Sequence, residues 1–382
     1  MTLHEVLAAR VERGELPGAV TLVARGDDVQ VDAIGTTAFG GAGPMRRDTV
    51  FRIASLTKPL LAALTMVLVE DDVIDLEEPV HRLLPELAGQ RVLARPDGPL
   101  DKTVPLDRPV TVEDLLTFRL GSGMVTEPVH NPPWPVLHAL REQQVISGPP
   151  YPPNPLTPDE WIRRFAAVPL MYQPGQKWQY NTGSDVLGVL LARAGGRPLG
   201  DVFRERLLDP LGLRATGFTV PAGSELPPLY GTDQESGTMV EIPGSGPETW
   251  IEPPVFPSGS GGLVSTVDDY HTFARMLRHK GVHGGTRILS EKSVELITSN
   301  HLTPEQITGA GGLLSGAGWG FGVAVVVAAG GIGRPGQYGW SGGTGTDWFN
   351  DPREDLTAIL FTQVNDILWN GTLTDFQREV YA

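Results

Sequence analysis

The chain has 382 residues, a formal net charge of −15 at pH 7, 47 Gly, 34 Pro and no Cys. This length predicts two domains, or one large domain with an insertion, and is sufficient for a full hydrophobic core. The lack of Cys excludes disulfides, metal–thiolate centres and a cysteine nucleophile within this chain. The acidic balance argues against a broad nucleic-acid or anionic-membrane surface, and only five of the basic residues are Lys.

The first 20 residues have the pattern of a short amphipathic helix. They contain no apolar run that resembles the core of a signal peptide. No uninterrupted apolar stretch approaches the ~18 residues that a membrane-spanning helix needs. We therefore expect a cytoplasmic protein with neither a membrane nor a nucleic acid as its partner.

The chain then alternates between strand and helix patterns. A hairpin is predicted from strands at 19–25 and 29–35, and an apolar helix follows at about 56–70. Residues 132–155 contain eight prolines, which argues against a regular helix there and indicates a surface excursion, such as a wall or lid over a pocket. Further helices are expected at 158–167, 184–194, 199–208, 267–278, about 291–299 and 375–382, and further strands at 322–329, 337–340, 346–350 and 356–364.

Sheet-forming segments thus lie at both ends of the chain, with mainly helical segments between them. The simplest architecture is an α/β (α+β) fold, in which both termini build one antiparallel sheet flanked by helices and a mostly helical domain is inserted. We place the sandwich domain at 1–75 and 260–382, and the inserted domain with irregular cleft-wall loops at 76–259.

The first candidate for chemistry is the sequence Ser55-Leu56-Thr57-Lys58. Residues three apart share one helix face, so Lys58 can reach the Ser55 hydroxyl. A serine becomes a good nucleophile when a neighbouring base takes its proton, and burial can lower the pKa of a lysine enough for this. The alternative without a catalytic role is a serine that caps the helix and a lysine on the surface. The apolar sequence that follows Lys58 argues against it, because a charged lysine there would be costly.

Two further segments are candidates. Tyr180, before the predicted helix at 184–194, can either pack in the core or handle protons beside a lysine. Residues 338–345 (YGWSGGTG) form either a tight turn or a Gly-rich strand edge that a substrate can approach closely. The same segment matches G-x-S-x-G, which would make Ser341 a nucleophile, but that motif needs a later His and a following helix, and neither is expected.

Metal sites are not indicated. His279 and His283 have helical spacing, but glycines interrupt the segment and no H-E-x-x-H is present. We expect no metal and no cofactor.

The three segments together resemble the motifs of the serine β-lactamase-like superfamily, which includes class C β-lactamases, D,D-peptidases and family VIII carboxylesterases. The resemblance extends over nearly the whole chain and implies an α/β sandwich with a helical domain and a cleft between them. Its matching segments are 51–59 (FRIASLTKP), 115–117 (LLT), 174–180 (PGQKWQY), 185–188 (DVLG), 261–270 (GGLVSTVDDY) and 339–343 (GWSGG).

The resemblance also implies roles for individual residues. Ser55 would be the acylated nucleophile, with Lys58 and Tyr180 as the proton-handling pair. The backbone N–H groups of Ser55 and Gly343 would form the oxyanion hole. The substrate-binding positions implied beside them are Trp340, Ser341, Gly342 and Thr182.

Two departures from the family pattern affect the substrate. The tyrosine motif usually has Asn at its third position, where this chain has Thr182, and the sheet-edge motif usually begins with Lys, where it has Trp340. That Lys helps to bind a substrate carboxylate, so the resemblance favours the esterase branch. We expect a serine hydrolase that cleaves small-molecule esters or amides through an acyl-serine. The alternatives are a weak β-lactamase, a D-amino-acid amidase or peptidase, an acyltransferase, or an inactive binding or sensor protein; the oligomeric state stays open.

Overall fold

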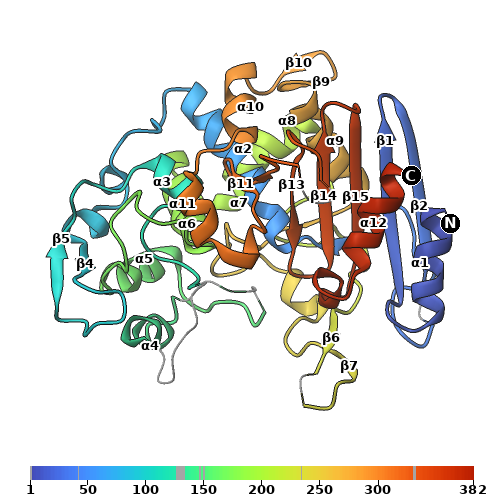
Figure 1. Ribbon diagram of the computed structural model, residues 1–382, viewed down its shortest axis with the longest axis horizontal. Coiled ribbons are helices and arrows are strands. Elements are labelled where there is room, and N and C mark those ends of the chain that lie inside the picture. The colour runs from blue at the N-terminus through green and yellow to red at the C-terminus, as the bar shows by residue number, and fades with distance from the viewer. Residues whose placement is uncertain are drawn as a thin grey trace.

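A seven-stranded antiparallel sheet joins the two ends of the chain (Figure 1). The computed structural model describes residues 2–41, 43–125, 134–145, 148, 151–233, 235–329 and 333–382. The N-terminal hairpin pairs with the last strand of the chain, so that Ala19 lies opposite Thr362. In spatial order the strands are β11 (Gly318–Trp319), β12 (Ala324–Val325), β13 (Tyr338–Gly342), β14 (Thr346–Asp351), β15 (Leu356–Thr362), β1 (Gly18–Arg25) and β2 (Asp28–Gly35).

The sheet agrees with the architecture expected from the sequence, with one strand much shorter than predicted. The segment 322–329 forms a strand only at β12, because the chain turns sharply at Gly322 with φ +73°. A Cβ at Gly322 would lie 2.6 Å from the Lys58 carbonyl oxygen, so this turn is packed directly against the helix that contains Lys58.

Helices cover both faces of the sheet. On one face lie α1 (Leu3–Glu12) and α12 (Thr372–Tyr381), which are side by side at the two chain ends (Figure 1). Arg10 Nη2 of α1 donates to Asp375 Oδ2 of α12 at 2.5 Å. The other face packs against α9 (Val267–Arg278), where the Ala274 carbonyl accepts a 2.8 Å hydrogen bond from the Asn350 side chain of β14.

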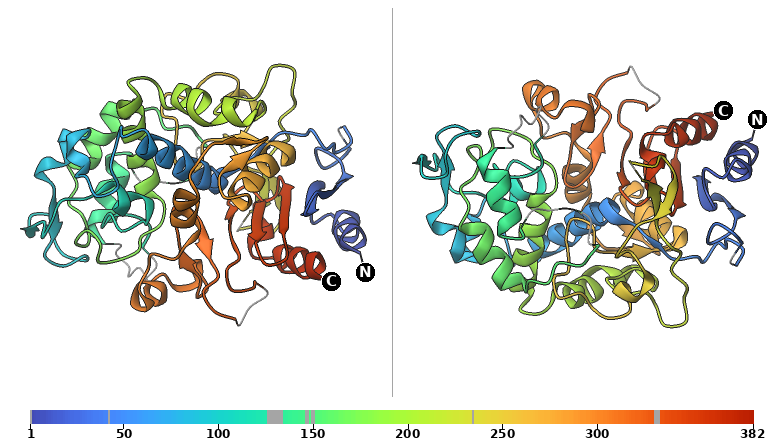
Figure 2. Two further views of the ribbon diagram at one scale, coloured as in Figure 1. Left: turned by 90° about the horizontal axis from the view of Figure 1, so that it is seen from above. Right: turned by 90° about the horizontal axis from the view of Figure 1, so that it is seen from below.

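Helix α2 (Thr57–Glu70) runs between the sheet and the mainly helical part of the molecule (Figure 2). It is apolar almost all round, and 11 of its 14 residues are buried. A helix that is buried on all sides is fixed by two layers at once, so its first turn is positioned accurately with respect to the sheet. The domain boundaries at 75/76 and 259/260 stay a prediction.

The predicted helices form close to their expected positions, except that the helix predicted at 199–208 changes its period after Phe203 and continues through a π-helical turn at Arg204–Leu208. The sequence patterns predict no helix at 112–116, 135–142 or 304–309, where the structure has one. The other α-helices are α3 (Val112–Leu116), α4 (Pro135–Glu142), α5 (Pro158–Ala166), α6 (Thr182–Gly195), α7 (Leu199–Phe203), α8 (Asp209–Leu211), α10 (Glu291–Thr298) and α11 (Pro304–Gly309). Short two-stranded ladders pair β3 (Phe51–Arg52) with β8 (Val264–Ser265), β4 (Arg91–Leu93) with β5 (Thr103–Pro105), β6 (Tyr230–Thr232) with β7 (Met239–Glu241), and β9 (Val282–His283) with β10 (Thr286–Arg287).

The proline-rich segment 132–155 is not wholly irregular, and the prediction that it holds no regular helix is wrong. Helix α4 forms inside it, with Pro135 at the first helical position, where the missing N–H costs nothing. Val136, Leu137 and Leu140 bury one face of this helix. The role of the segment as a wall or lid stays a prediction, because residues 126–133, 146–147 and 149–150 lie outside the described part of the chain. None of the helices described is long and apolar enough to cross a membrane.

Candidate active site

Ser55 lies in a 3-10 turn, η1 (Ala54–Leu56), between β3 and α2, where the sheet meets the mainly helical part of the molecule. The residue before it, Ala54, has φ +42°, a conformation that is strained for a residue with a side chain. Hydrogen bonds fix the turn on both sides, since Ile53 N donates to Leu263 O at 3.0 Å and Tyr270 Oη donates to Leu56 O at 3.1 Å. The backbone around Ser55 is therefore held in a set, strained geometry.

Lys58 lies in the first turn of α2 and is buried, with 1% of its surface exposed. Its Nζ lies 3.0 Å from Ser55 Oγ and 2.6 Å from the carbonyl oxygen of Ser260. Burial lowers the pKa of Lys58 to about 7, although the nearby carboxylate of Asp185 acts in the opposite direction. Near neutral pH this amine can therefore exist without a proton and accept one from a hydroxyl group.

The loop behind Lys58 is held by the buried carboxylate of Asp185 on α6. Its Oδ1 accepts hydrogen bonds from Ser258 Oγ at 2.8 Å and from Ser260 N at 3.1 Å. Its Oδ2 accepts from Ser260 Oγ at 3.1 Å. Asp185 thus positions the carbonyl to which Lys58 donates, and its negative charge favours the protonated form of Lys58. Sequence reasoning did not single out this residue, Ser258 or Ser260 as members of the site.

Tyr180 completes the polar cluster from the loop before α6. Lys58 Nζ lies 4.5 Å from the centroid of its ring, and Trp340 Nε1 donates to its hydroxyl at 2.6 Å. Burial raises the pKa of Tyr180 to about 12, against the lowering effect of its hydrogen bonds with Ser55 and Trp340. The phenol is therefore protonated at neutral pH and can donate to an oxygen that gains negative charge. Directly after it, Asn181 turns the chain into α6 with φ +89°.

An aromatic cluster surrounds Tyr180. Phe118 and Trp319 contact its ring edge-on, with centroids 5.6 Å and 6.2 Å away, and Trp178 lies at 5.8 Å. These rings exclude water from one side of the site and strengthen electrostatic interactions there. Sequence reasoning did not identify Phe118 or Trp319, because they come from segments some 60 and 140 residues away from Tyr180 and no local pattern marks them.

The turn after β13 is tied to the segment that precedes Ser55. Thr344 Oγ1 donates to the Arg52 carbonyl, and Thr346 Oγ1 donates to the Ile53 carbonyl at 3.2 Å. Gly342 is needed here, since a Cβ at this position would lie 2.4 Å from the Ile53 carbonyl oxygen. These contacts fix the end of β13 against η1.

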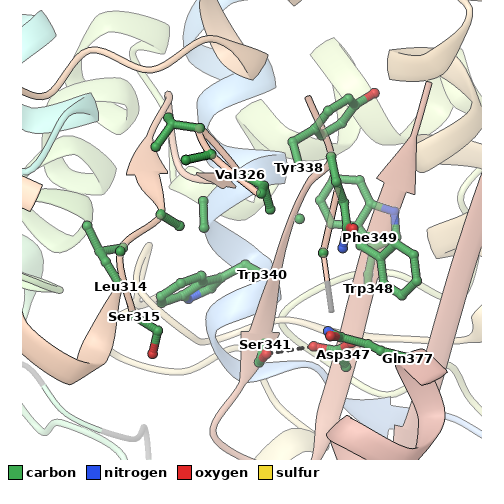
Figure 3. A pocket seen from close by; sticks show the side chains of 18 of the residues that line it. Leu314, Ser315, Val326, Tyr338, Trp340, Ser341, Asp347, Trp348, Phe349 and Gln377 are labelled. Carbon is green, nitrogen blue, oxygen red and sulfur yellow. Dashed lines mark hydrogen bonds between the residues drawn. The ribbon is translucent and has the colours of Figure 1, made fainter. Parts of the chain in front are cut away.

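The residues predicted to bind the substrate, Trp340, Ser341, Gly342 and Thr182, do not all face the same side of the sheet or the same cavity. Trp340 faces Tyr180, whereas the next residue of the strand, Ser341, points to the opposite face of the sheet, where its Oγ donates to Asp347 Oδ1 at 2.6 Å (Figure 3). Gly343 is exposed in the turn, and Thr182 is buried as the first residue of α6. The nucleophile-elbow interpretation of Ser341 does not fit, because Ser341 lies inside a strand that continues by a turn into β14.

Comparison with known proteins identifies the class to which this fold and site belong. The family model described as Beta-lactamase matches residues 3–377, and the chain therefore belongs to the beta-lactamase family. This confirms the family and the antiparallel-sheet fold expected from the motifs.

Individual relatives cover nearly the whole chain. Protein Rv1367c of Mycobacterium tuberculosis (strain ATCC 25618 / H37Rv) is 36% identical over 365 residues, which cover 92% of this chain and 87% of the relative. Esterase EstB of Burkholderia gladioli is 31% identical over 401 residues, which cover 100% of this chain and 94% of EstB. The structure of EstCE1, described as a hydrolase with promiscuous acyltransferase activity, superimposes with a TM-score of 0.82 at 26% identity and covers 100% of this chain and 97% of that one.

The ionisation of Lys58 can be measured without any substrate. With isotope-labelled lysine, the five Lys side chains give five NMR resonances. We expect the resonance that is missing in Lys58→Met to titrate near pH 7, and Asp185→Asn to lower its midpoint, because that variant removes a charge that favours the protonated amine. Lys280, which is exposed and paired with Glu291, is the internal control with a raised pKa. A Lys58 midpoint at the ordinary value of 10.5 would contradict the assignment.

The burial of Lys58 also predicts a pH-dependent cost in stability. Its pKa in the folded state is below the unfolded value of 10.5, so the protein loses stability as the pH falls from about 10.5 to about 7. Lys58→Met removes this loss. In urea unfolding we expect the stability of Lys58→Met relative to the wild type to be higher at about pH 6 than at about pH 9. A relative stability that is equal at both pH values, or lower at the acidic one, would show that Lys58 does not change its ionisation on folding.

Proposed function

We propose that this protein is a serine hydrolase that cleaves carboxylic esters through an acyl-enzyme, with Ser55 as the nucleophile. The observation that carries the proposal is the buried contact between Ser55 Oγ and Lys58 Nζ at 3.0 Å, beside the Tyr180 hydroxyl. The whole-length likeness to the esterase EstB and to the hydrolase EstCE1 supports the same activity. The substrate is a small-molecule ester or amide, and the proposed chemistry uses only groups of the chain itself.

In the acylation step, the neutral Lys58 amine accepts the Ser55 proton, directly or through Tyr180, as Oγ attacks the carbonyl carbon. The amine keeps its hydrogen bond to the Ser260 carbonyl, at 2.6 Å, so its lone pair stays directed at the serine. The raised pKa of Tyr180 keeps this hydroxyl protonated until a stronger base is formed nearby.

The carbonyl oxygen then gains a negative charge that needs hydrogen-bond donors already in place. The backbone N–H groups of Ser55 and Gly343 are the proposed donors. The strained turn at Ala54 and the threonine hydrogen bonds from Thr344 and Thr346 support this assignment, because both keep the two segments in register before the substrate arrives.

Collapse of the tetrahedral intermediate breaks the bond to the alcohol oxygen. Tyr180 donates its proton to this leaving alkoxide and regains one from the protonated Lys58. Water then attacks the acyl-Ser55 carbonyl and gives one proton to the same pair of residues. The bond between the acyl carbon and Ser55 Oγ breaks, the pair returns this proton to Oγ, and the carboxylic acid is released. If an alcohol or amine takes the place of water, the same steps transfer the acyl group, which is the alternative that the EstCE1 description favours.

Trp340 argues for esters over β-lactams. Its indole occupies the position at which the superfamily motif has a Lys, and its N–H is used by the Tyr180 hydroxyl. A neutral ring does not bind a substrate carboxylate as an ammonium group does. Parallel assays with a p-nitrophenyl ester and with nitrocefin separate the two activities. The cytoplasmic location stays a prediction.

The nucleophile is tested with Ser55→Ala. We expect this variant to lose about 10⁴-fold or more of its p-nitrophenyl butyrate hydrolysis, because no other group can form the acyl-enzyme. We also expect it to lose covalent labelling by a fluorophosphonate, detected as a mass shift of the intact protein. Ser236→Ala, at an exposed serine between β6 and β7, is the matched control and keeps both properties. Stoichiometric labelling of Ser55→Ala would refute the assignment.

The role of Trp340 is tested with Trp340→Phe, which keeps a ring but removes the N–H that donates to Tyr180. Loss of this hydrogen bond raises the pKa of Tyr180 further and weakens its stabilisation of negative charge. We expect kcat to fall by about tenfold with little change in KM. Trp319→Phe is the control, since Trp319 is in the same aromatic cluster but its Nε1 donates to the Leu116 carbonyl at 3.3 Å. Equal losses in both variants would point to packing alone.

A further inference from the structure

We propose that Asp347 is a positioning residue for the reaction, which fixes the Gly343 amide through its hydrogen bond with Ser341. The inference rests on the proposed function and assigns a role to a buried carboxyl group on the face of the sheet turned away from Ser55. Neither residue contacts Ser55, Lys58 or Tyr180 through a hydrogen bond in the described structure. Their influence on the site passes along the backbone of β13.

The geometry of the pair is set by the pairing of two strands. Ser341 on β13 and Asp347 on β14 are direct cross-strand partners, and Ser341 Oγ donates to Asp347 Oδ1 at 2.6 Å (Figure 3). Ser341 is the last residue of β13 with a side chain, because Gly342 ends the strand and Gly343 follows it. The hydrogen bond therefore lies two residues before the amide that we propose to bind the oxyanion.

Gly343 has no side chain that could restrain its backbone. It is exposed, and a Cβ at this residue would meet no atom within 4 Å. Gly345, two residues later, has φ +89°, so the turn contains two residues without side chains. Contacts on either side must therefore restrict the backbone, since glycine adds freedom and not order. Thr344 and Thr346 supply these contacts after Gly343, and the pair of Ser341 and Asp347 supplies the contact before it.

Burying a carboxyl group costs free energy, and a contact that only holds two strands together does not need one. Asp347 is 3% exposed, and burial raises its pKa to about 7 against the lowering effect of hydrogen bonds from Ser341 and Gln377. The groups that face it are neutral: the Ser341 hydroxyl of β13 and the Gln377 amide of α12. An apolar pair would fill this register more cheaply. The free-energy cost of burying Asp347 is explained if its short hydrogen bond with Ser341 is needed to hold β13 in place.

A cavity lies beside the pair. It has a volume of about 520 Å³ and is lined by Ser341, Asp347 and Gln377 together with Leu314, Ala317 and Val326 (Figure 3). Close packing is therefore incomplete next to Ser341, and the hydrogen bond to Asp347 is a specific restraint on this part of β13.

The test compares Ser341→Ala, Asp347→Ala and the double variant in p-nitrophenyl butyrate hydrolysis. Removing an oxyanion donor completely costs about 10²–10³ in kcat, so loosening one predicts a loss of about tenfold with KM nearly unchanged. The two single variants should lose similar factors, and the double variant no more than either, because they break one interaction. Ser341→Thr retains the hydroxyl on a β-branched side chain and should restore kcat.

Thr357→Val is the matched control. Thr357 is a fully buried strand residue whose Oγ1 donates to Asn350 Oδ1 at 2.7 Å, so this variant removes a similar hydrogen bond from the same sheet away from Gly343. It should lower stability but not kcat. Unchanged kcat in Ser341→Ala, or an equal loss of kcat in Thr357→Val, would overturn the proposal.

Hydrogen exchange separates this inference from the proposed function. We expect the amides of residues 338–345 to exchange faster in Ser341→Ala and Asp347→Ala than in the wild type, whether or not the protein hydrolyses the ester. A wild type without turnover would refute the proposed function. Unchanged exchange in this segment would refute the positioning role even in an active enzyme.

Discussion

The burial of one lysine constrains most of the site. Lys58 is inside a helix that is apolar on every side, where a permanent positive charge would be expensive, and it keeps two polar contacts, Ser55 Oγ and the Ser260 carbonyl. The Ser260 loop needs Asp185 to hold it, and Asp185 comes from a helix that begins directly after Tyr180. A single desolvated amine thus links the central helix, the Ser260 loop and α6.

The same burial sets stability against activity. In the proposed mechanism Lys58 acts as a base because burial disfavours its protonated form, and the same burial lowers the free energy of unfolding at neutral pH. The Asp185 carboxylate moderates this effect, since it raises the pKa that burial lowers. The two opposing influences leave the pKa of Lys58 at about 7, so that both its protonated and its unprotonated form are accessible at neutral pH.

A second constraint comes from the way the sheet is closed. The N-terminal hairpin extends the sheet beyond β15, while β12 and β14 pair with β13 on its two sides. The end of β13 is tied to the segment before α2 by the side chains of Thr344 and Thr346. Gly342 allows this close approach, because a side chain there would collide with the Ile53 carbonyl. The hydrogen bonds of the Thr344 and Thr346 hydroxyl groups restrict the backbone that glycine leaves flexible. The hydrogen bond from Trp340 to the Tyr180 hydroxyl then joins the end of this strand to the segment that leads into α6.

Much of this was determined by the sequence alone. The spacing of Ser55 and Lys58 places both on one helix turn, the alternating segments identify the hairpin and the C-terminal strands, and the order of the motifs identifies the family. These features are local, since they depend on neighbours within one or two turns. The tertiary structure alone decided the rest: that Phe118 and Trp319 enclose Tyr180, that the Ser260 carbonyl faces Lys58, that Ser341 points toward Asp347, and that a helix forms at Pro135–Glu142. Each of these depends on strand register, on packing between distant segments, or on a proline that falls at a helix start and not inside it, and local periodicity contains none of that information.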